Sequence, residues 1–181
     1  DVMGRDAQRV TCLHDPDSDV LDAEMARAMA PLEKRPGNLA ELRTHLLDVM
    51  WDDVGVMRDA NGLQRGLKRI DEIDAELSAT GVAPDNLAFN LSWHDWLNLR
   101  SLVDMSKVIA NAALSRENSR GAHFREDFPD TGAMVDSYFT LATASDKAIS
   151  VTRAPVQFTI VKPGETLLGE GDAETLVEGA V

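Results

Sequence analysis

Between residues 59 and 79 the apolar positions recur at intervals of three and four residues, the spacing of an amphipathic helix. Charged side chains fill the opposite face, and Gly81 followed by Pro84 ends the pattern. We therefore predict a helix from near Asp59 to Ala79 with one buried face. The apolar set consists of Leu63, Leu67, Ile70, Ile73 and Leu77.

A second helix is predicted upstream of this one. Asn38 is a preferred N-cap residue, and Glu41 three residues later completes a variant of the capping box. Apolar positions then keep to one face until about Gly55, which predicts a second buried face. These positions are Leu39, Leu42, Leu46, Val49 and Met50.

The widest apolar stripe follows Ser92 and predicts the most buried helix of the chain. Ser92 and Asp95 have the spacing of a capping box, with Leu91 and Trp96 at the two staple positions around it. We predict that this helix ends near Arg120-Gly121, with the glycine as its C-terminal stop. Its apolar positions are Trp96, Leu99, Leu102, Val103, Met105, Val108, Ile109, Ala112 and Ala113.

The two ends of the chain show weaker patterns. Helical spacing from Leu21 to Leu32 is broken by Pro31 and Pro36, so we expect a short helix lying against the main body. After Pro129 the chain becomes rich in β-forming residues, which predicts two or three short strands or extended arms. The candidate strands are 138–141, 148–151 and 156–161. The last dozen residues are expected to fray.

These elements predict a mainly α fold. The expected architecture is a three-helix bundle of the up-down-up, spectrin-repeat-like kind, with a short flanking helix and an extended or β C-terminal arm. The predicted boundaries are a linker with a short helix over 1–36, the bundle over 37–129, and the arm over 130–181. A chain of 181 residues is long enough to bury such a core.

Composition narrows the classes of partner. The net charge of −13 argues against nucleic acid and against an anionic membrane surface, because both need a basic footprint. A single cysteine, Cys12, excludes an internal disulfide and a cysteine-based metal cluster. The sequence holds no apolar run of membrane-spanning length, so we expect no direct membrane insertion and a cytoplasmic location.

Common cofactor and metal signatures are absent from the sequence. It contains no Gly-x-Gly-x-x-Gly, no Gly-x-x-x-x-Gly-Lys and no His-Glu-x-x-His, and its histidines lack metal-ligand spacing. We therefore predict no catalytic, cofactor-binding or metal-binding residue in this chain. Asp52-Asp53 is interpreted as a solvated helix end, and Trp51, Trp93 and Trp96 as core or rim residues.

Directional polar groups are concentrated between Arg116 and Asp127. After Gly121, His123, Arg125 and Asp127 alternate with other residues, so an extended chain would place all three on one side. The fork of an arginine suits carboxylates, phosphates or carbonyl clusters. Three interpretations stay open, namely a contact between domains, an internal polar brace and direct ligand binding.

The same segment resembles a family signature. Ser119-Arg120-Gly121-Ala122-His123-Phe124-Arg125-Glu126-Asp127-Phe128-Pro129 is similar to a run near the C-terminus of succinate dehydrogenase and fumarate reductase flavoprotein subunits, a family that includes L-aspartate oxidase. The resemblance covers most of 40–162, including Met50-Trp51 and Val56-Met57-Arg58. One departure is Asn118, where the family usually has glutamate.

The resemblance implies that this chain is the C-terminal helical domain of such an enzyme. FAD is then expected in the parent protein and none in the fragment, and Asp1 would follow the flavin domain. The parent would interconvert succinate and fumarate by hydride transfer, with an aspartate-oxidase-like activity as an alternative. A free-standing helical protein-interaction module is a further alternative.

The resemblance also implies partners. The helical domain is expected to pack on the flavin-binding domain of the same protein, and an iron-sulfur subunit is a further expected partner that would bring the enzyme to the inner membrane face. The candidate docking contacts are Arg116, Arg120, His123, Arg125 and Asp127.

Overall fold

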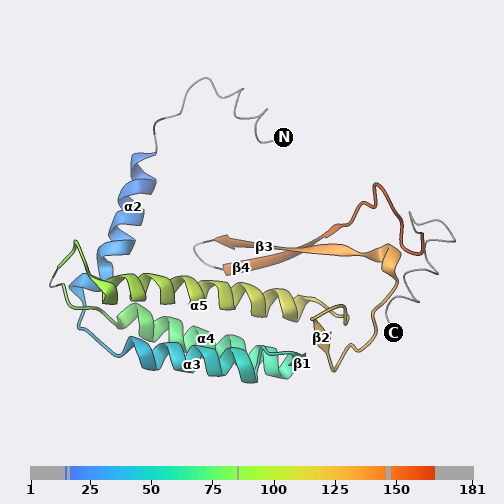
Figure 1. Ribbon diagram of the computed structural model, residues 1–181, viewed down its shortest axis with the longest axis horizontal. Coiled ribbons are helices and arrows are strands. Elements are labelled where there is room, and N and C mark those ends of the chain that lie inside the picture. Colours follow the sequence, from blue (N-terminus) through green and yellow to red (C-terminus); the bar gives the residue numbers. More distant parts are fainter. Residues whose placement is uncertain (1–14, 16, 85, 146–147, 166–181) are drawn as a thin grey trace, which may run out of the picture.

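Three long helices form the body of the molecule in the computed structural model (Figure 1). They are α3 (Leu39–Asp52), α4 (Ala60–Ala79) and α5 (Leu91–Ser115), and they lie side by side as a bundle. The predicted fold class is therefore confirmed. The structure describes residues 15, 17–84, 86–145 and 148–165. The expected fraying of the last dozen residues concerns residues outside these ranges.

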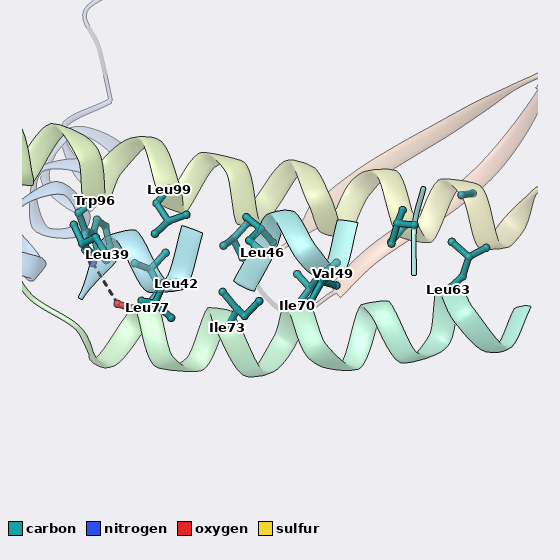
Figure 2. Packing of buried hydrophobic residues seen from close by; sticks show 14 of the residues in the cluster. Leu39, Leu42, Leu46, Val49, Leu63, Ile70, Ile73, Leu77, Trp96 and Leu99 are labelled. Atoms are coloured by element: carbon teal, nitrogen blue, oxygen red, sulfur yellow. Dashed lines mark hydrogen bonds between the residues drawn. The ribbon is translucent and has the colours of Figure 1, made fainter. Parts of the chain in front are cut away.

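The core lies along the axis of the bundle, where apolar faces of α3, α4 and α5 meet (Figure 2). The stripe predicted for α5 was too wide, because its Leu102, Met105 and Ile109 are exposed. Burying each leucine or isoleucine contributes about 1.5–3 kcal/mol, so these faces supply the main driving force for folding. Trp96 closes one end, and its indole N–H donates to the carbonyls of Leu77 and Thr80 at 3.3 and 2.9 Å. The core members that are at most 2% exposed are Leu42, Leu46, Val49, Val54, Leu63, Ile70, Leu77, Leu99, Val103 and Ala110.

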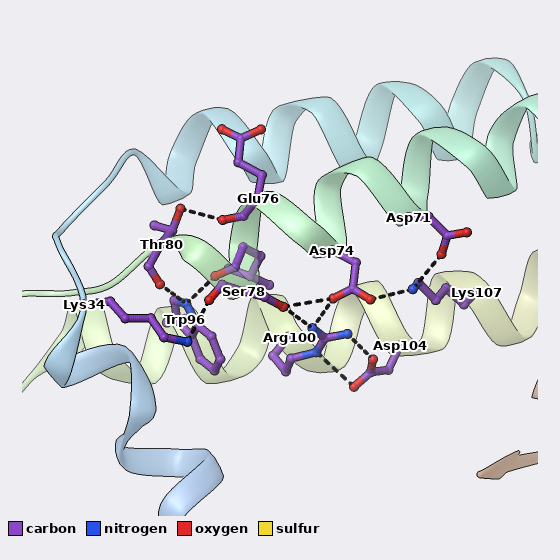
Figure 3. Close-up of polar contacts among 11 residues, drawn as sticks. Lys34, Asp71, Asp74, Glu76, Ser78, Thr80, Trp96, Arg100, Asp104 and Lys107 are labelled. Carbon is purple, nitrogen blue, oxygen red and sulfur yellow. Dashed lines mark hydrogen bonds and ion pairs between the residues drawn. The ribbon is translucent and has the colours of Figure 1, made fainter. Parts of the chain in front are cut away.

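Charged residues on α4 and α5 join the same two helices at their outer edge (Figure 3). Asp74 accepts hydrogen bonds from both Arg100 and Lys107, the second at 2.5 Å. Lys107 also pairs with Asp71, and Arg100 with Asp104 one turn further along α5. The network fixes how α4 and α5 lie against each other, since each cation bridges two carboxylates.

Side-chain caps start the helices, and one of them differs from the sequence prediction. The oxygen of Asn38 accepts from the Glu41 N–H at 3.2 Å, which confirms the predicted start of α3. The cap of α5 is Asn90, whose oxygen accepts from the Trp93 N–H at 2.9 Å, so the capping box at Ser92 was wrong. The amide of Asn90 also donates to the Ala83 carbonyl at 2.7 Å, and this longer-range contact selects the cap.

The end of α5 also differs from the prediction. The helix stops at Ser115, several residues before Arg120-Gly121. Gly121 has φ 58° and lies in the turn that pairs Arg120 with His123. The helix stops early because its last carbonyls accept hydrogen bonds from arginine side chains later in the chain.

The N-terminal helix α2 (Ser18–Met29) projects from one end of the bundle (Figure 1). None of its residues is buried, so the expectation that it lies against the main body was wrong. The short 3-10 helix η1 (Ala30–Glu33) follows, and its Pro31 is buried. This turn redirects the chain at the bundle surface, which leaves α2 outside it. No helix among the described residues has the length and apolarity needed to cross a bilayer.

The C-terminal arm is an antiparallel hairpin of β3 (Tyr138–Ser145) and β4 (Ala148–Pro155) that follows η2 (Met134–Asp136). Its register runs from Tyr138↔Pro155 to Ser145↔Ala148. Two of the three candidate strands are thus confirmed, whereas 156–161 forms no strand. The hairpin contacts α5, and Arg153 donates to the Ser115 carbonyl at 2.5 Å.

Candidate functional site

A short parallel ladder brings the motif segment to the start of α4. β1 (Met57–Arg58) pairs with β2 (Phe124–Arg125), in the register Met57↔Phe124 and Arg58↔Arg125. The Glu126 N–H extends the ladder by donating to the Arg58 carbonyl at 2.7 Å. The loop after α3 and the segment after α5 therefore meet at one end of the bundle (Figure 1).

Arg125 lies at the centre of this end and is 1% exposed. Its Nη1 donates to the carbonyls of Ala113, Leu114 and Arg116 at 3.0 to 3.1 Å, at the end of α5 where carbonyls lose their helical partners. The Ala113 carbonyl also accepts from the Arg116 N–H at 3.3 Å. A cation is also favoured there by the helix dipole. Arg125 therefore caps α5, and this explains why the helix ends before the glycine.

Asp127 connects this cap to the N-terminus of the neighbouring helix α4. Its carboxylate accepts from Nε and Nη2 of Arg125 at 2.6 and 2.7 Å, and from the Ala60 N–H at 2.9 Å. The first contact is a bidentate ion pair, and the second satisfies a backbone donor in the first turn of α4. The hydrogen bonds from Arg125 lower the pKa of Asp127 to about 2, although burial opposes the charged form.

This lowered pKa predicts a loss of stability in acid. The pKa in the folded state lies below the unfolded value of ~3.9, so the carboxylate stabilises the fold fully above about pH 4. That contribution disappears as the pH falls towards 2. We expect Asp127→Asn to flatten the fall in urea midpoint between about pH 5 and pH 3. Asp48→Asn, at an exposed position of α3, is the control, and its urea midpoint should fall with pH as steeply as that of the wild type.

Arg120 points to a different part of the molecule. Its guanidinium donates to the Thr131 and Ala133 carbonyls at 2.5 and 2.8 Å and to the Ser137 hydroxyl at 2.8 Å. These contacts hold the segment that leads into the hairpin. Ser119 supports the same turn, because its hydroxyl accepts from the Arg125 N–H and donates to the Phe128 carbonyl, each at 2.8 Å.

His123 is buried beside Arg58, with 7% of its surface exposed. Its Nδ1 lies 2.9 Å from Nη1 of Arg58. Because a guanidinium can only donate, Nδ1 must accept, and the ring proton is on Nε2. Burial lowers the pKa of His123, and the positive charges of Arg116, Arg58 and Arg125 lower it further. The imidazole is therefore a neutral acceptor that holds Arg58.

Asp53 corrects another sequence interpretation. It was expected at a solvated helix end, but it is 4% exposed. Its carboxylate accepts from Arg65 at 2.7 Å and from Arg69 at 2.9 Å, so two arginines of α4 compensate its burial. Trp96 and the half-buried Trp93 fit the expectation of core and rim residues, whereas Trp51 is 79% exposed.

The structure thus brings four of the five candidate docking residues to one end of the bundle, with Arg120 beside them but turned towards the hairpin. Arg58 belongs to the same cluster, and the sequence interpretation did not select it. Its place in the quoted run Val56-Met57-Arg58 was the available signal. In this structure the side chains of Arg120, Arg125 and Asp127 form an internal brace.

The groove that the structure shows on the bundle does not fit a flavin. The groove between α3 and α4 has a volume of about 260 Å³, below the ~300–1,000 Å³ typical of small-molecule sites, and two glutamates would repel a diphosphate. Within the described ranges, no cluster of His, Cys, Asp and Glu has the arrangement of a metal site. The groove is lined by His45, Val49, Arg69, Glu72, Ile73 and Glu76.

Comparison with known families decides the relationship. Residues 43–167 match the family described as fumarate reductase flavoprotein C-term. The chain belongs to this family. The match covers the whole bundle apart from the first turn of α3, together with the motif segment and the hairpin. The resemblance inferred from the sequence motif is confirmed, and the chain is a C-terminal domain of the succinate dehydrogenase and fumarate reductase type of flavoprotein.

Individual relatives agree with this assignment. An uncharacterized FAD-dependent oxidoreductase of Methanocaldococcus jannaschii is 31% identical over 134 residues, which are 72% of this chain and 24% of that protein. The fumarate reductase flavoprotein subunit of Haemophilus influenzae is 28% identical, over 93% of this chain and 29% of the relative. L-aspartate oxidase 1 of Ralstonia nicotianae is 40% identical over 83 residues, 46% of this chain and 14% of that protein.

Solved structures show the same fold. Mycobacterium smegmatis Sdh1, in a complex with UQ1, superposes with a TM-score of 0.71 at 25% identity, over 87% of this chain and 27% of that chain. The chain therefore spans between about a seventh and three tenths of the length of these relatives.

Proposed function

We propose that the chain is the C-terminal helical domain of an FAD-dependent oxidoreductase that interconverts succinate and fumarate by hydride transfer. Membership of the flavoprotein family over 43–167 carries this proposal. FAD and the substrate would bind to the flavin-binding part of the same protein, and FAD would supply the hydride acceptor. This chain supplies a rigid bundle, braced by Arg125 and Asp127, that packs on that part.

We also propose the wider assembly that the family suggests. An iron-sulfur subunit would be a partner of the flavoprotein, whose location would be cytoplasmic and peripheral at the inner membrane face. The L-aspartate oxidase among the relatives favours aspartate as a second candidate substrate. Succinate, fumarate and aspartate are all small dicarboxylates, and their contacts would lie outside this chain.

The proposal is tested with the complete flavoprotein that contains this chain. We expect fumarate to reoxidise a reduced viologen dye in its presence, and succinate to reduce an artificial acceptor. Aspartate-dependent peroxide formation with neither of these activities would support the second candidate. A purified protein that contains no flavin would contradict both.

The chain of 181 residues makes a separate prediction when it is produced alone. It should give a helical circular dichroism spectrum and a cooperative unfolding transition, because its core is internal to the bundle. It should show no flavin absorption band and no fumarate reduction. A yellow protein with bound flavin would contradict the proposal that FAD binds outside this chain.

A further inference from the structure

One side-chain hydrogen bond joins the segment after α3 to the segment after α5. Nη1 of Arg58, in β1, lies 2.9 Å from Nδ1 of His123, which directly precedes β2. The ladder between β1 and β2 contains only two residue pairs, so its backbone contacts are few. We call the contact between His123 and Arg58 the His–Arg latch, because it ties the two strands together in addition to these backbone contacts.

The latch requires a neutral imidazole. A guanidinium has no acceptor, so it can bind Nδ1 of His123 only when that nitrogen offers its lone pair. Protonation would place a hydrogen on Nδ1 and turn two donors and two positive charges towards each other. A charged His123 therefore loses the hydrogen bond and repels Arg58.

Positive groups face His123 from each element that packs around it. Arg58 belongs to β1, Arg125 belongs to β2, and Arg116 follows the end of α5. Burial lowers the pKa of the His123 imidazole, and the charge of Arg116 and then the charges of the other two arginines lower it further. A proton on the ring would add a fourth positive charge to this group.

Acceptors near His123 are already engaged within the described part of the chain. Nε2 of His123 is buried without a hydrogen-bond partner there. The Arg116 carbonyl favours the charged ring, but it already accepts from Arg125 at 3.0 Å. The carboxylate of Asp127 is bound by Arg125 in a bidentate pair, at 2.6 and 2.7 Å. The other carboxylates that act on Arg125 are Asp59 and Glu117.

We propose that the His–Arg latch is a pH-sensitive switch, which is closed while His123 is neutral and opens when the imidazole takes up a proton. Opening separates the ring from Arg58 and loosens the β1–β2 ladder. The ion pair of Arg125 and Asp127 and the core of the bundle do not involve the imidazole, so the fold is kept while this end opens.

The pH range of the switch follows from the direction of the pKa shift. The pKa of His123 in the closed state lies below the ordinary value of ~6.5, so the open state binds the proton more tightly. The latch is therefore closed above about pH 6.5 and opens as the pH falls below this value. Asp127, with a pKa of about 2, loses its charge only in stronger acid, so the two effects are separate.

Hydrogen–deuterium exchange in the complete flavoprotein, read by mass spectrometry, tests the switch. The Glu126 N–H donates to the Arg58 carbonyl at 2.7 Å, so its protection from exchange reports on the ladder. After correction for the intrinsic exchange rate, this protection should fall about tenfold between pH 7.5 and pH 5.5, as expected for one proton taken up on opening. Amides of α4 between Ile70 and Leu77 lie in the core and should keep their protection.

His123→Asn makes the test specific, because its side-chain oxygen can accept from Arg58 and does not titrate. In this variant the protection of the Glu126 amide should stay constant over the same pH range. His45→Asn replaces an exposed histidine of α3 and is the matched control, which should show the wild-type fall.

Three results would each overturn the proposal. The first is constant protection of the Glu126 amide in the wild type, which needs no variant to be folded. The second is an equal fall in His123→Asn, because another group would then be responsible. The third is an equal fall in the amides of α4, which would show that acid destabilises the whole bundle and not this end alone.

Discussion

Replacing Arg125 with alanine is expected to lower the free energy of unfolding of this chain by about 3–5 kcal/mol. The substitution removes the side-chain donor of three carbonyls at the end of α5, of which Ala113 alone keeps a backbone donor, the Arg116 N–H. It also leaves the Asp127 carboxylate without its bidentate partner. The guanidinium also packs over the Phe128 ring, with Cζ 5.0 Å from its centroid. Urea denaturation followed by circular dichroism would measure the loss.

Two further variants make this result specific. Arg125→Lys keeps the positive charge but cannot reach the α5 carbonyls and Asp127 at the same time, so it should recover only a minor part of the loss. Arg116→Ala removes a neighbouring arginine with one weak contact and should cost less than about 1 kcal/mol. Equal losses for Arg125→Ala and Arg116→Ala would show that the brace contributes little.

These expected losses in the free energy of unfolding change how variants of the Ser119–Pro129 motif must be interpreted. The sequence motif made Arg120 and Arg125 natural choices for disrupting a docking surface. In the structure both are occupied by contacts within the chain, so their substitution would loosen the domain itself and reduce docking only as a consequence. Arg116 is the more informative position, because its side chain makes a single weak hydrogen bond within the described part of the chain.

The helices could be predicted from the sequence because their determinants are local. The period of the apolar residues and the N-cap Asn38 lie within one or two turns of the element that they specify, and α4 follows its predicted bounds closely. The family could also be recognised, since no helical or strand propensity generates the run from Ser119 to Pro129. Periodicity and motif therefore identified the bundle and its relatives.

The roles of the polar residues could not be predicted, because they depend on contacts between distant segments. Arg125 ends α5 from nine to twelve residues further along the chain, and Asp127 reaches the N-terminus of α4 across 67 residues. Asp53 is buried only because α4 returns two arginines to it. From the sequence alone, a charged residue near a helix end is expected to be exposed to solvent. Only the fold shows which distant side chains pair with it.

The bundle core provides the second large effect. Leu99→Ala should lower the free energy of unfolding by about 2–5 kcal/mol, because Leu99 is 0% exposed and its loss leaves a cavity between the helices. Leu102→Ala is the matched control on the same helix. Leu102 is 46% exposed, so it should cost less than about 1 kcal/mol in the same urea titration. Equal losses of unfolding free energy for the two variants would mean that Leu102 is as well buried as Leu99. The assignment of Leu99 to the buried face of α5 and of Leu102 to its exposed face would then be wrong.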